Sequence, residues 1–181
     1  MARVIVWNLV TLDGRFEGAR KWDLGFHEAA WSDDLAALSL EFGARAGLLV
    51  FGRITYEGMK AYWTTTEDET EVRAYMNALP KLVGSRSLTT ADWTNARVTA
   101  DPIAEVARLR AEPGKDIFVF GSALLADGLL AAGLVDEVML AIAPVTLAAG
   151  TPFFKRALRF DLLETRPLQR GVILARYAPA A

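Results

Sequence analysis

The stretch at 116–144 constrains the fold of this chain more than any other. An apolar run at 117–120 is followed by Gly121-Ser122, then by a helical pattern, and then by a second apolar run at 138–142. This order predicts a strand, a tight turn, a helix and a second strand that runs parallel to the first. The stretch is therefore the crossover unit of an α/β sheet.

The turn between this first strand and the helix is a candidate anion site. We expect Ser122 to be the N-cap of the helix and Gly133 its C′ residue. A helix N-terminus at the carboxyl end of a strand offers free N–H groups and the positive end of the helix dipole to a phosphate. Many turns of this kind bind nothing, so the turn alone leaves a purely structural interpretation open.

Length and composition exclude several classes of function. With 181 residues, a hydrophobic share of 52% and a net charge of −2, we expect one globular domain over residues 1–181. No basic patch indicates nucleic-acid binding, and no apolar run suits a secretory signal or a membrane span, so we expect a cytoplasmic protein that binds neither nucleic acid nor membrane. Without cysteine, the chain has no disulfide, thiolate zinc site or cysteine nucleophile.

The remaining segments continue the α/β pattern. We expect strands at 3–10, 48–51 and 81–84, a short strand within 93–99, a helix from Ser32 or Asp33 to about residue 46, and a helix opened by Asp101-Pro102. The segments 160–168 and 172–177 predict a closing antiparallel hairpin.

The segment 11–32 shows no helical or strand period. A structureless stretch of this length inside a compact domain is either disordered or a functional covering loop. Trp22 and Trp31 favour the loop, because disordered linkers rarely contain large aromatic side chains.

Several predicted strands end beside residues that suit a phosphate. These residues are Gly52, Arg53 and Thr55 after one strand, Ser85 and Arg86 after the next, and Gly121 and Ser122 in the crossover unit. The carboxyl ends of parallel strands in an open α/β sheet form one shared crevice. Asn8, near the carboxyl end of the first strand, would face either a neighbouring side chain or a ligand.

The residue types that are missing narrow the chemistry. His27 is the only histidine, which excludes a multi-histidine metal site, and we expect it to be a surface or loop residue. Neither a Walker lysine nor the G-x-G-x-x-G fingerprint is present. Hydride transfer remains possible, because a nicotinamide supplies the reactivity and the protein supplies orientation and a dry site.

The chain resembles the dihydrofolate-reductase-like proteins that include the reductase domain of the riboflavin-pathway bifunctional enzyme, and among them the small stand-alone bacterial members. The matching stretches follow the family's order across nearly the whole chain: 11–14 (TLDG), 49–57 (LVFGRITYE), 81–88 (KLVGSRSL), Gly121-Ser122, 133–137 (GLVDE) and 144–147 (PVTL). The resemblance implies a three-layer α/β/α fold with a mixed, mostly parallel sheet and a C-terminal antiparallel hairpin. It also implies a homodimer.

The resemblance further implies an NADPH site. Gly52, Arg53 and Thr55 would lie beside the pyrophosphate, and Ser85 and Arg86 would hold the 2′-phosphate of the adenosine. Gly121, Ser122, Ala123, Leu124 and Leu125 would offer backbone amides across the diphosphate, and the loop from Leu12 onward would cover the nicotinamide. Three positions depart from the family's pattern: Ser122 and Ala148 stand where glycine is common, and Gly84 stands where an apolar residue is common.

The residues that contact substrate are less sharply defined. Pterin-reducing relatives carry an acid on the first helix, where this chain has Asp33 and Asp34, although Asp33 also suits a helix cap. We expect Asp13 and Asp33 as catalytic candidates. Asn8, Trp22, Tyr56 and Trp63 are candidates for substrate contacts.

Two functions stay open at this point. The first is an NADPH-dependent reductase of a small heteroaromatic or carbonyl-like compound, similar to the reductase of 5-amino-6-(5-phosphoribosylamino)uracil in riboflavin biosynthesis. The second is a nucleotide-binding member of the same fold that has lost catalysis. The zinc-binding cysteines of the riboflavin enzyme's deaminase half have no counterpart in residues 1–181, so we expect the reductase type of domain alone here.

Overall fold

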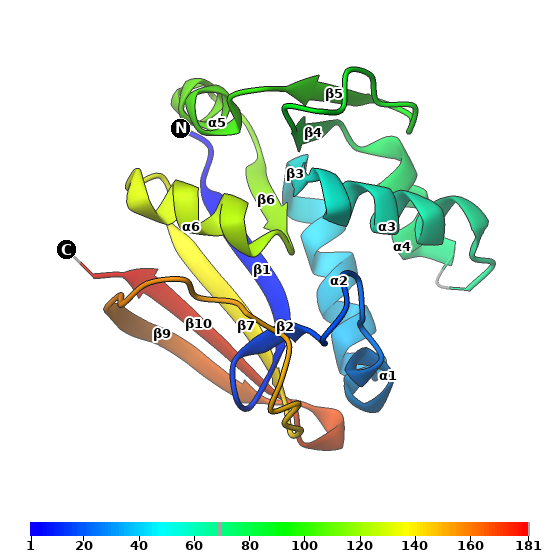
Figure 1. Cartoon of the computed structure of the whole chain (residues 1–181), viewed down its shortest axis with the longest axis vertical. Helices are drawn as coiled ribbons and strands as arrows, with labels where there is room; N and C mark the ends of the chain where they lie inside the picture. Colours follow the sequence, from blue (N-terminus) through cyan, green and yellow to red (C-terminus); the bar gives the residue numbers. More distant parts are fainter. Residues whose placement is uncertain (69, 181) are drawn as a thin grey trace.

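A computed structural model describes residues 1–68 and 70–180, which form an eight-stranded sheet flanked by helices (Figure 1). The strand order is β5-β4-β3-β6-β1-β7-β10-β9. The strands are β1 (Val4–Thr11), β3 (Ala46–Gly52), β4 (Lys81–Gly84), β5 (Ala96–Thr99), β6 (Asp116–Phe120), β7 (Glu137–Ala143), β9 (Phe160–Pro167) and β10 (Ile173–Pro179). The strands from β5 to β7 are parallel, and β10 and β9 add the predicted antiparallel pair.

Two layers of helices bury the two faces of the sheet. On one face lie α1 (Phe26–Ala30), α2 (Asp33–Arg45), α3 (Arg53–Thr65) and α4 (Thr70–Ala78), and on the other lie α5 (Pro102–Ala111) and α6 (Ala123–Ala131). The predicted three-layer α/β/α fold is confirmed. No helix within the described residues is long and apolar enough to cross a bilayer.

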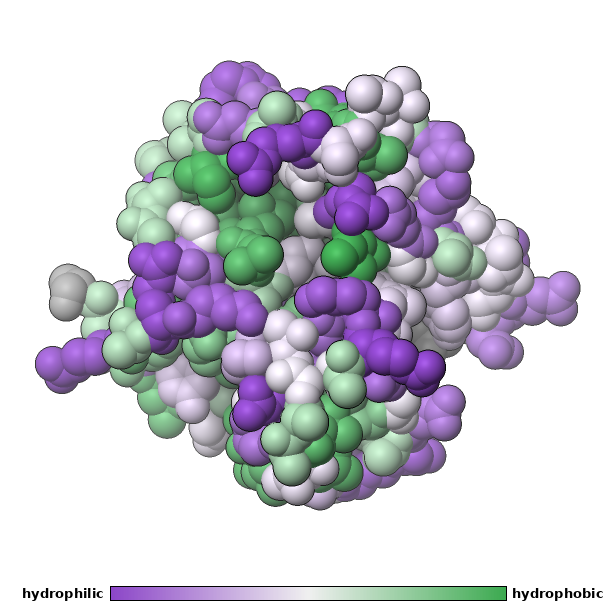
Figure 2. All heavy atoms as spheres, in the orientation of Figure 1, coloured by the Kyte–Doolittle hydropathy of each residue, from purple (hydrophilic) through white to green (hydrophobic). Residues whose placement is uncertain are grey.

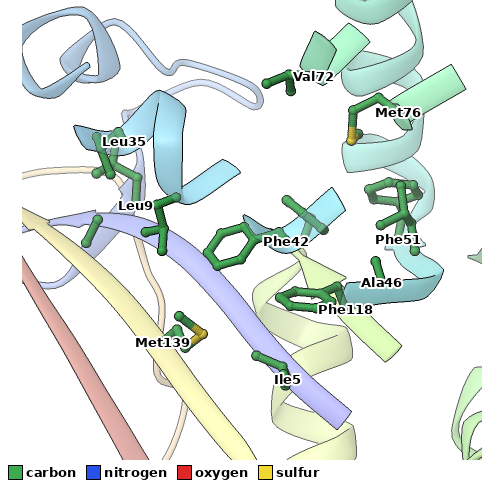
Figure 3. Close-up of a cluster of buried hydrophobic side chains, with 14 of the residues drawn as sticks. Ile5, Leu9, Leu35, Phe42, Ala46, Phe51, Val72, Met76, Phe118 and Met139 are labelled. Atoms are coloured by element: carbon green, nitrogen blue, oxygen red, sulfur yellow. The ribbon is translucent and has the colours of Figure 1, made fainter. Parts of the chain in front are cut away.

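Strand β1 shows why both faces need cover. Ile5 and Leu9 belong to the apolar cluster that includes Phe42 of α2, whereas Val4 and Val6 belong to the cluster that includes α6. Successive side chains of a strand point to opposite faces, so a continuous apolar run demands helices on both sides. Figure 3 shows the first cluster, with Phe42 beside Phe118 between the sheet and α2.

The local signals at the start of α5 and in the C-terminal hairpin are confirmed. The Asp101 carboxylate accepts a hydrogen bond from the Ala104 N–H at 3.0 Å, as expected of an N-cap followed by proline. Strand β7 runs parallel to β6 as predicted, but β1 lies between them.

Three features of the fold differ from the expectations. The segment 11–32 contains β2 (Arg15–Glu17), which pairs with β8 (Thr151–Pro152), and it also contains α1. Helix α4 was not predicted, since Val72 and Met76 are the only residues of α4 that are buried. Their two positions give too weak a helical period to detect.

The departures at Gly84 and Ala148 have local causes. A Cβ on Gly84 would lie 2.9 Å from Pro102 Cγ, so the glycine lets the start of α5 pack against β4. Ala148 has a φ of 56°, the left-handed region that glycine occupies without strain, and its N–H donates to the Asp13 carboxylate at 2.9 Å. Both changes therefore leave the fold in place.

Candidate functional site

A cleft of about 1610 Å³ opens at the carboxyl ends of β1, β3, β4 and β6. In the view of Figure 2, the surface is hollowed between α6 and α3, and hydrophobic side chains lie at the rim. Ordinary ligand pockets have volumes of roughly 300–1,000 Å³, so this cleft has room for more than one small ligand. One side of it is formed by the strand ends, and the other by α1, α2, α3 and α4.

On the strand-end side, one hydroxyl joins the two glycine turns. The Gly52 N–H donates to Ser122 Oγ at 2.7 Å, and Ser122 Oγ donates to Thr55 Oγ1 at 2.7 Å. Ser122 occupies the N-cap position of α6, but it has a φ of 55° and its side chain makes no capping bond, which corrects our expectation for this residue. The first N–H groups of a helix have no acceptor within the helix. Because Ser122 Oγ is turned away from them, those of α6 are left for a ligand.

The two turns are pressed together so closely that only glycine fits. A Cβ on Gly52 would lie 2.9 Å from Ser122 Oγ, and one on Gly121 would lie 3.0 Å from Thr55 Cγ2 and Oγ1. Gly121 also has a φ of 55°. The N-termini of α3 and α6 thus meet at a cradle of two closely packed turns, and free backbone amides at this place fit the diphosphate of a dinucleotide.

The residues after β4 lie at the outer end of the same side. Ser85 Oγ accepts hydrogen bonds from the N–H groups of Ser87 and Leu88, so this oxygen shapes the turn that carries Arg86. Arg86 is exposed at the cleft and forms no ion pair within residues 1–68 and 70–180. Arg53, by contrast, pairs with Glu57 at 3.0 Å.

The covering segment is held against the cleft by Glu17. This buried carboxylate accepts hydrogen bonds from Thr151 Oγ1 at 2.7 Å, from Lys21 Nζ at 3.0 Å and from the Trp22 N–H at 3.1 Å. Burial raises the pKa of Glu17, but these hydrogen bonds outweigh it and leave the pKa below its ordinary value. The Trp22 ring lies directly on Gly58 of α3, where a Cβ would overlap it. The segment therefore covers the cleft next to α3.

The helical side holds polar atoms without partners. His27 Nε2 and Trp63 Nε1 are buried and have no hydrogen-bond partner among the described residues. Asn8 Nδ2 is also without a partner, but strand alternation places it with Val6 and Val10 on the α6 face of β1. Burial lowers the pKa of His27 to about 4, so the imidazole is neutral near pH 7. The expectation that His27 is a surface or loop residue is corrected in part: it lies on α1 and its Nε2 is buried, although the residue as a whole is only partly buried. No local signal in the sequence distinguishes this environment.

Three predicted site residues lie outside the lining of the cleft. The Asp13 carboxylate accepts from Thr11 Oγ1 and from the Leu147 and Ala148 N–H groups. The bond from Thr11 is the main cause of its lowered pKa. The Tyr56 hydroxyl accepts from the Trp93 N–H at 3.0 Å. Asp33 is the first residue of α2. These contacts favour structural roles.

The other predicted residues are brought together. All ten cofactor candidates line the cleft, and so do Asn8, Trp22 and Trp63. Sequence reasoning missed several apolar residues that line the helical side: Leu24, Trp31, Leu35, Met59, Val72 and Met76. No cluster of three or more His, Asp and Glu side chains in the described part of the chain is arranged to hold a metal ion.

Comparison with known proteins identifies the family of this fold. Residues 2–174 match the RibD C-terminal domain. The chain belongs to the RibD C-terminal domain family. A curated relative, the uncharacterized protein YyaP of Bacillus subtilis (strain 168), is 29% identical over 180 residues, which covers 94% of this chain and 92% of YyaP.

Two solved structures share the fold of this RibD C-terminal domain. A protein from Shewanella sp. PV-4 that is named for riboflavin biosynthesis matches with a TM-score of 0.76 at 20% identity, over 100% of both chains. Dihydrofolate reductase from Enterococcus faecalis, complexed with NADP(H) and RAB-propyl, matches with a TM-score of 0.67 at 14% identity, over 99% of this chain and 97% of that one.

Proposed function

We propose that this RibD C-terminal domain is an NADPH-dependent reductase of a small heteroaromatic or carbonyl-like compound. The observation that carries the proposal is the Ser122 hydroxyl, which ties the Gly52 turn to Thr55 and leaves two helix N-termini side by side. Neither Gly52 nor Gly121 carries a side chain, so a ligand's oxygens can approach the backbone amides of the two turns.

Different residues of the strand-end side would bind different parts of the cofactor. The amides of Ala123, Leu124 and Leu125 would bind the diphosphate, together with the N-terminus of α3 at Arg53 and Thr55. Arg86, unpaired within the described residues, would form a charge-assisted contact with the 2′-phosphate, on a turn that Ser85 shapes. The NADP(H) in the dihydrofolate reductase of the same fold supports this arrangement.

When bound, a reduced nicotinamide supplies a hydride from its C4 to an electrophilic carbon of the substrate, whose displaced electron pair takes a proton from water. The protein's own part is to orient the two ligands and to exclude bulk water. Trp22, held by its N–H bond to Glu17 and packed on Gly58, covers the cleft from the loop side. We propose that this segment opens to admit ligands and then closes.

A second candidate function has one observation in its favour. Neither Asp13 nor Asp33 lines the cleft, so the carboxylates expected to donate a proton lie elsewhere. A member that binds nucleotide without catalysis would keep the same cradle. Calorimetric titration with NADPH, followed by loss of NADPH absorbance over a panel of pterins, aminouracil ribityl compounds and quinonoid carbonyls, separates the two. Binding without turnover favours the second function, and failure of NADPH to bind contradicts both.

We also propose that the protein is a homodimer formed through its C-terminal hairpin. Strand β9 is the edge of the sheet, and Leu162 and Leu163 are 58% and 51% exposed on it. An exposed apolar edge strand is a template for pairing with a second copy. Light scattering at micromolar concentration should give twice the monomer mass. Leu162→Arg should give a monomer, whereas Leu40→Arg on α2 should not, and a monomeric wild-type protein would exclude the dimer.

A further inference from the structure

The helical side of the cleft is lined mainly by aromatic and aliphatic side chains. The bulky members are contributed by α2, α3, α4 and the segments on either side of α1: Leu24, Trp31, Leu35, Met59, Trp63 and Met76. The residues of α2 that reach the lining are Leu35 and Ser39, while the Asp34 carboxylate accepts the Gln169 N–H at 2.8 Å. No carboxylate from α2 therefore reaches a ligand on this side.

The charges on this side do not suit a phosphate. Among the cations of the lining, Lys21 pairs with Glu17 at 3.0 Å, Arg170 Nη1 donates to the Glu28 carbonyl at 3.1 Å, and the exposed Lys155 adds a third charge. The side chains of Glu17, Glu28 and Asp68 line the same side. A phosphate monoester carries nearly two negative charges near pH 7 and would meet at least as many carboxylates as cations.

The unpartnered polar atoms call for acceptors on the ligand. Trp63 Nε1 can only donate, and Trp63 is more than nine-tenths buried, at 8% exposure. Neutral His27 adds a second unpartnered nitrogen, Nε2. A buried donor without a partner destabilises the protein, so an acceptor oxygen that binds there gains free energy.

We propose that the helical side of the cleft binds a neutral, planar carbonyl compound that carries no phosphate. The aromatic walls select a flat ring, the Trp63 donor selects a carbonyl oxygen, and the balance of charges disfavours an anion. The inference rests on the proposed reductase function and narrows its substrate class. It sets this chain apart from the reduction of a phosphoribosyl aminouracil.

Isatin, a planar ketone, serves as the probe. Its reduction adds a hydride to the ketone carbon and breaks the C=O π bond; the oxygen takes a proton from water, and NADPH becomes NADP⁺. Indole is the matched ligand without carbonyl oxygens. An aminouracil ribonucleoside and its 5′-phosphate form a second matched pair that differs only in the phosphate.

Binding to the NADPH complex should separate these ligands. Isatin should bind more tightly than indole, and the ribonucleoside more tightly than its 5′-phosphate. Trp63→Phe should weaken isatin binding by about 3–10-fold, the effect of one net hydrogen bond of roughly 1 kcal/mol, and should leave indole unchanged. His27→Phe tests the unpartnered His27 Nε2 in the same way and should also weaken isatin binding. Trp31→Phe removes a similar volume from the lining, but its nitrogen is not among the buried unpartnered atoms, so it should not change the isatin-to-indole ratio.

The outcomes distinguish this inference from the proposed function. NADPH affinity is measured by titration in the same samples before any second ligand is added. If NADPH binds but the 5′-phosphate binds at least tenfold more tightly than its nucleoside, the substrate class is wrong and the reductase proposal stands. If Trp63→Phe and His27→Phe both leave the ratio of isatin affinity to indole affinity unchanged, the inference is also overturned. If NADPH does not bind at all, the proposed function itself fails.

Discussion

The two sides of the cleft are built in different ways. The strand-end side is defined by backbone: two glycine turns, two helix N-termini and one hydroxyl that joins them. The helical side is defined by side chains from α1, α2, α3 and α4 that approach one another only in the folded chain. Backbone amides suit a ligand part that is the same in every reaction, and variable side chains suit the part that differs. We therefore assign cofactor to the first side and substrate to the second.

The largest expected effect tests the backbone side. Gly121→Ala places a methyl group 3.0 Å from Thr55 and forces alanine into left-handed geometry, at a cost of roughly 1–2 kcal/mol. Because this strain and the contact with Thr55 act together, NADPH affinity should fall by about 30–100-fold, or roughly 2–2.7 kcal/mol, in a calorimetric titration. Gly114→Ala is the control, because its Cβ would meet open space. An unchanged affinity for the Gly121→Ala protein would show that the cradle does not hold the cofactor.

Arg86→Ala tests the outer end of the same side. A charge-assisted contact is worth roughly 1.5–3 kcal/mol, so the preference for NADPH over NADH should shrink by about ten- to hundredfold. Arg53→Ala is the comparison, because Arg53 is already paired with Glu57 and should affect both cofactors alike. Equal affinity of the wild-type protein for NADPH and NADH would show that Arg86 does not contact the 2′-phosphate.

Low pH should destabilise the protein through His27, whose pKa is lowered by burial on the helical side. The pKa of His27 in the folded protein is about 4, whereas an unfolded histidine titrates near its ordinary value of 6.5. Between these values the unfolded chain binds more protons, so the free energy of unfolding falls as pH falls. From about pH 7 to pH 5 the wild type should lose about 2 kcal/mol more than His27→Phe in urea unfolding, at 1.36 kcal/mol per pKa unit. If the free energies of unfolding of the wild type and of His27→Phe changed equally with pH, His27 would have an ordinary pKa and would be exposed to solvent.

Trp22→Ala should give the smallest change in NADPH affinity. It should also separate the role of the covering loop in turnover from the role of the strand-end side in cofactor binding. The ring covers the cleft on Gly58 without forming part of the cradle. Turnover should fall, while NADPH affinity stays within about threefold, or ~0.7 kcal/mol. A loss of cofactor affinity as large as that of Gly121→Ala would mean that the covering loop belongs to the cofactor side.

The difference between the sides also explains what could be predicted from sequence. Glycine turns after apolar strands are local signals, so the sequence alone predicts Gly52 and Gly121 at the strand ends. The bond from Gly52 to Ser122 spans 70 positions, and a capping preference pointed the Ser122 hydroxyl the other way. The burial of His27 depends on packing between distant segments, which no local pattern encodes.

The most direct test of the account follows backbone amides in an amide proton–nitrogen correlation spectrum during titration with NADPH. The account predicts the largest shifts at two segments that are far apart in sequence, residues 52–55 and 121–125, with a smaller shift at Arg86. A subsequent addition of isatin should move Trp63 Nε1 and leave the first two segments in place. Shifts confined to other parts of the chain, or none at saturating NADPH, would contradict the assignment of the strand-end side to the cofactor.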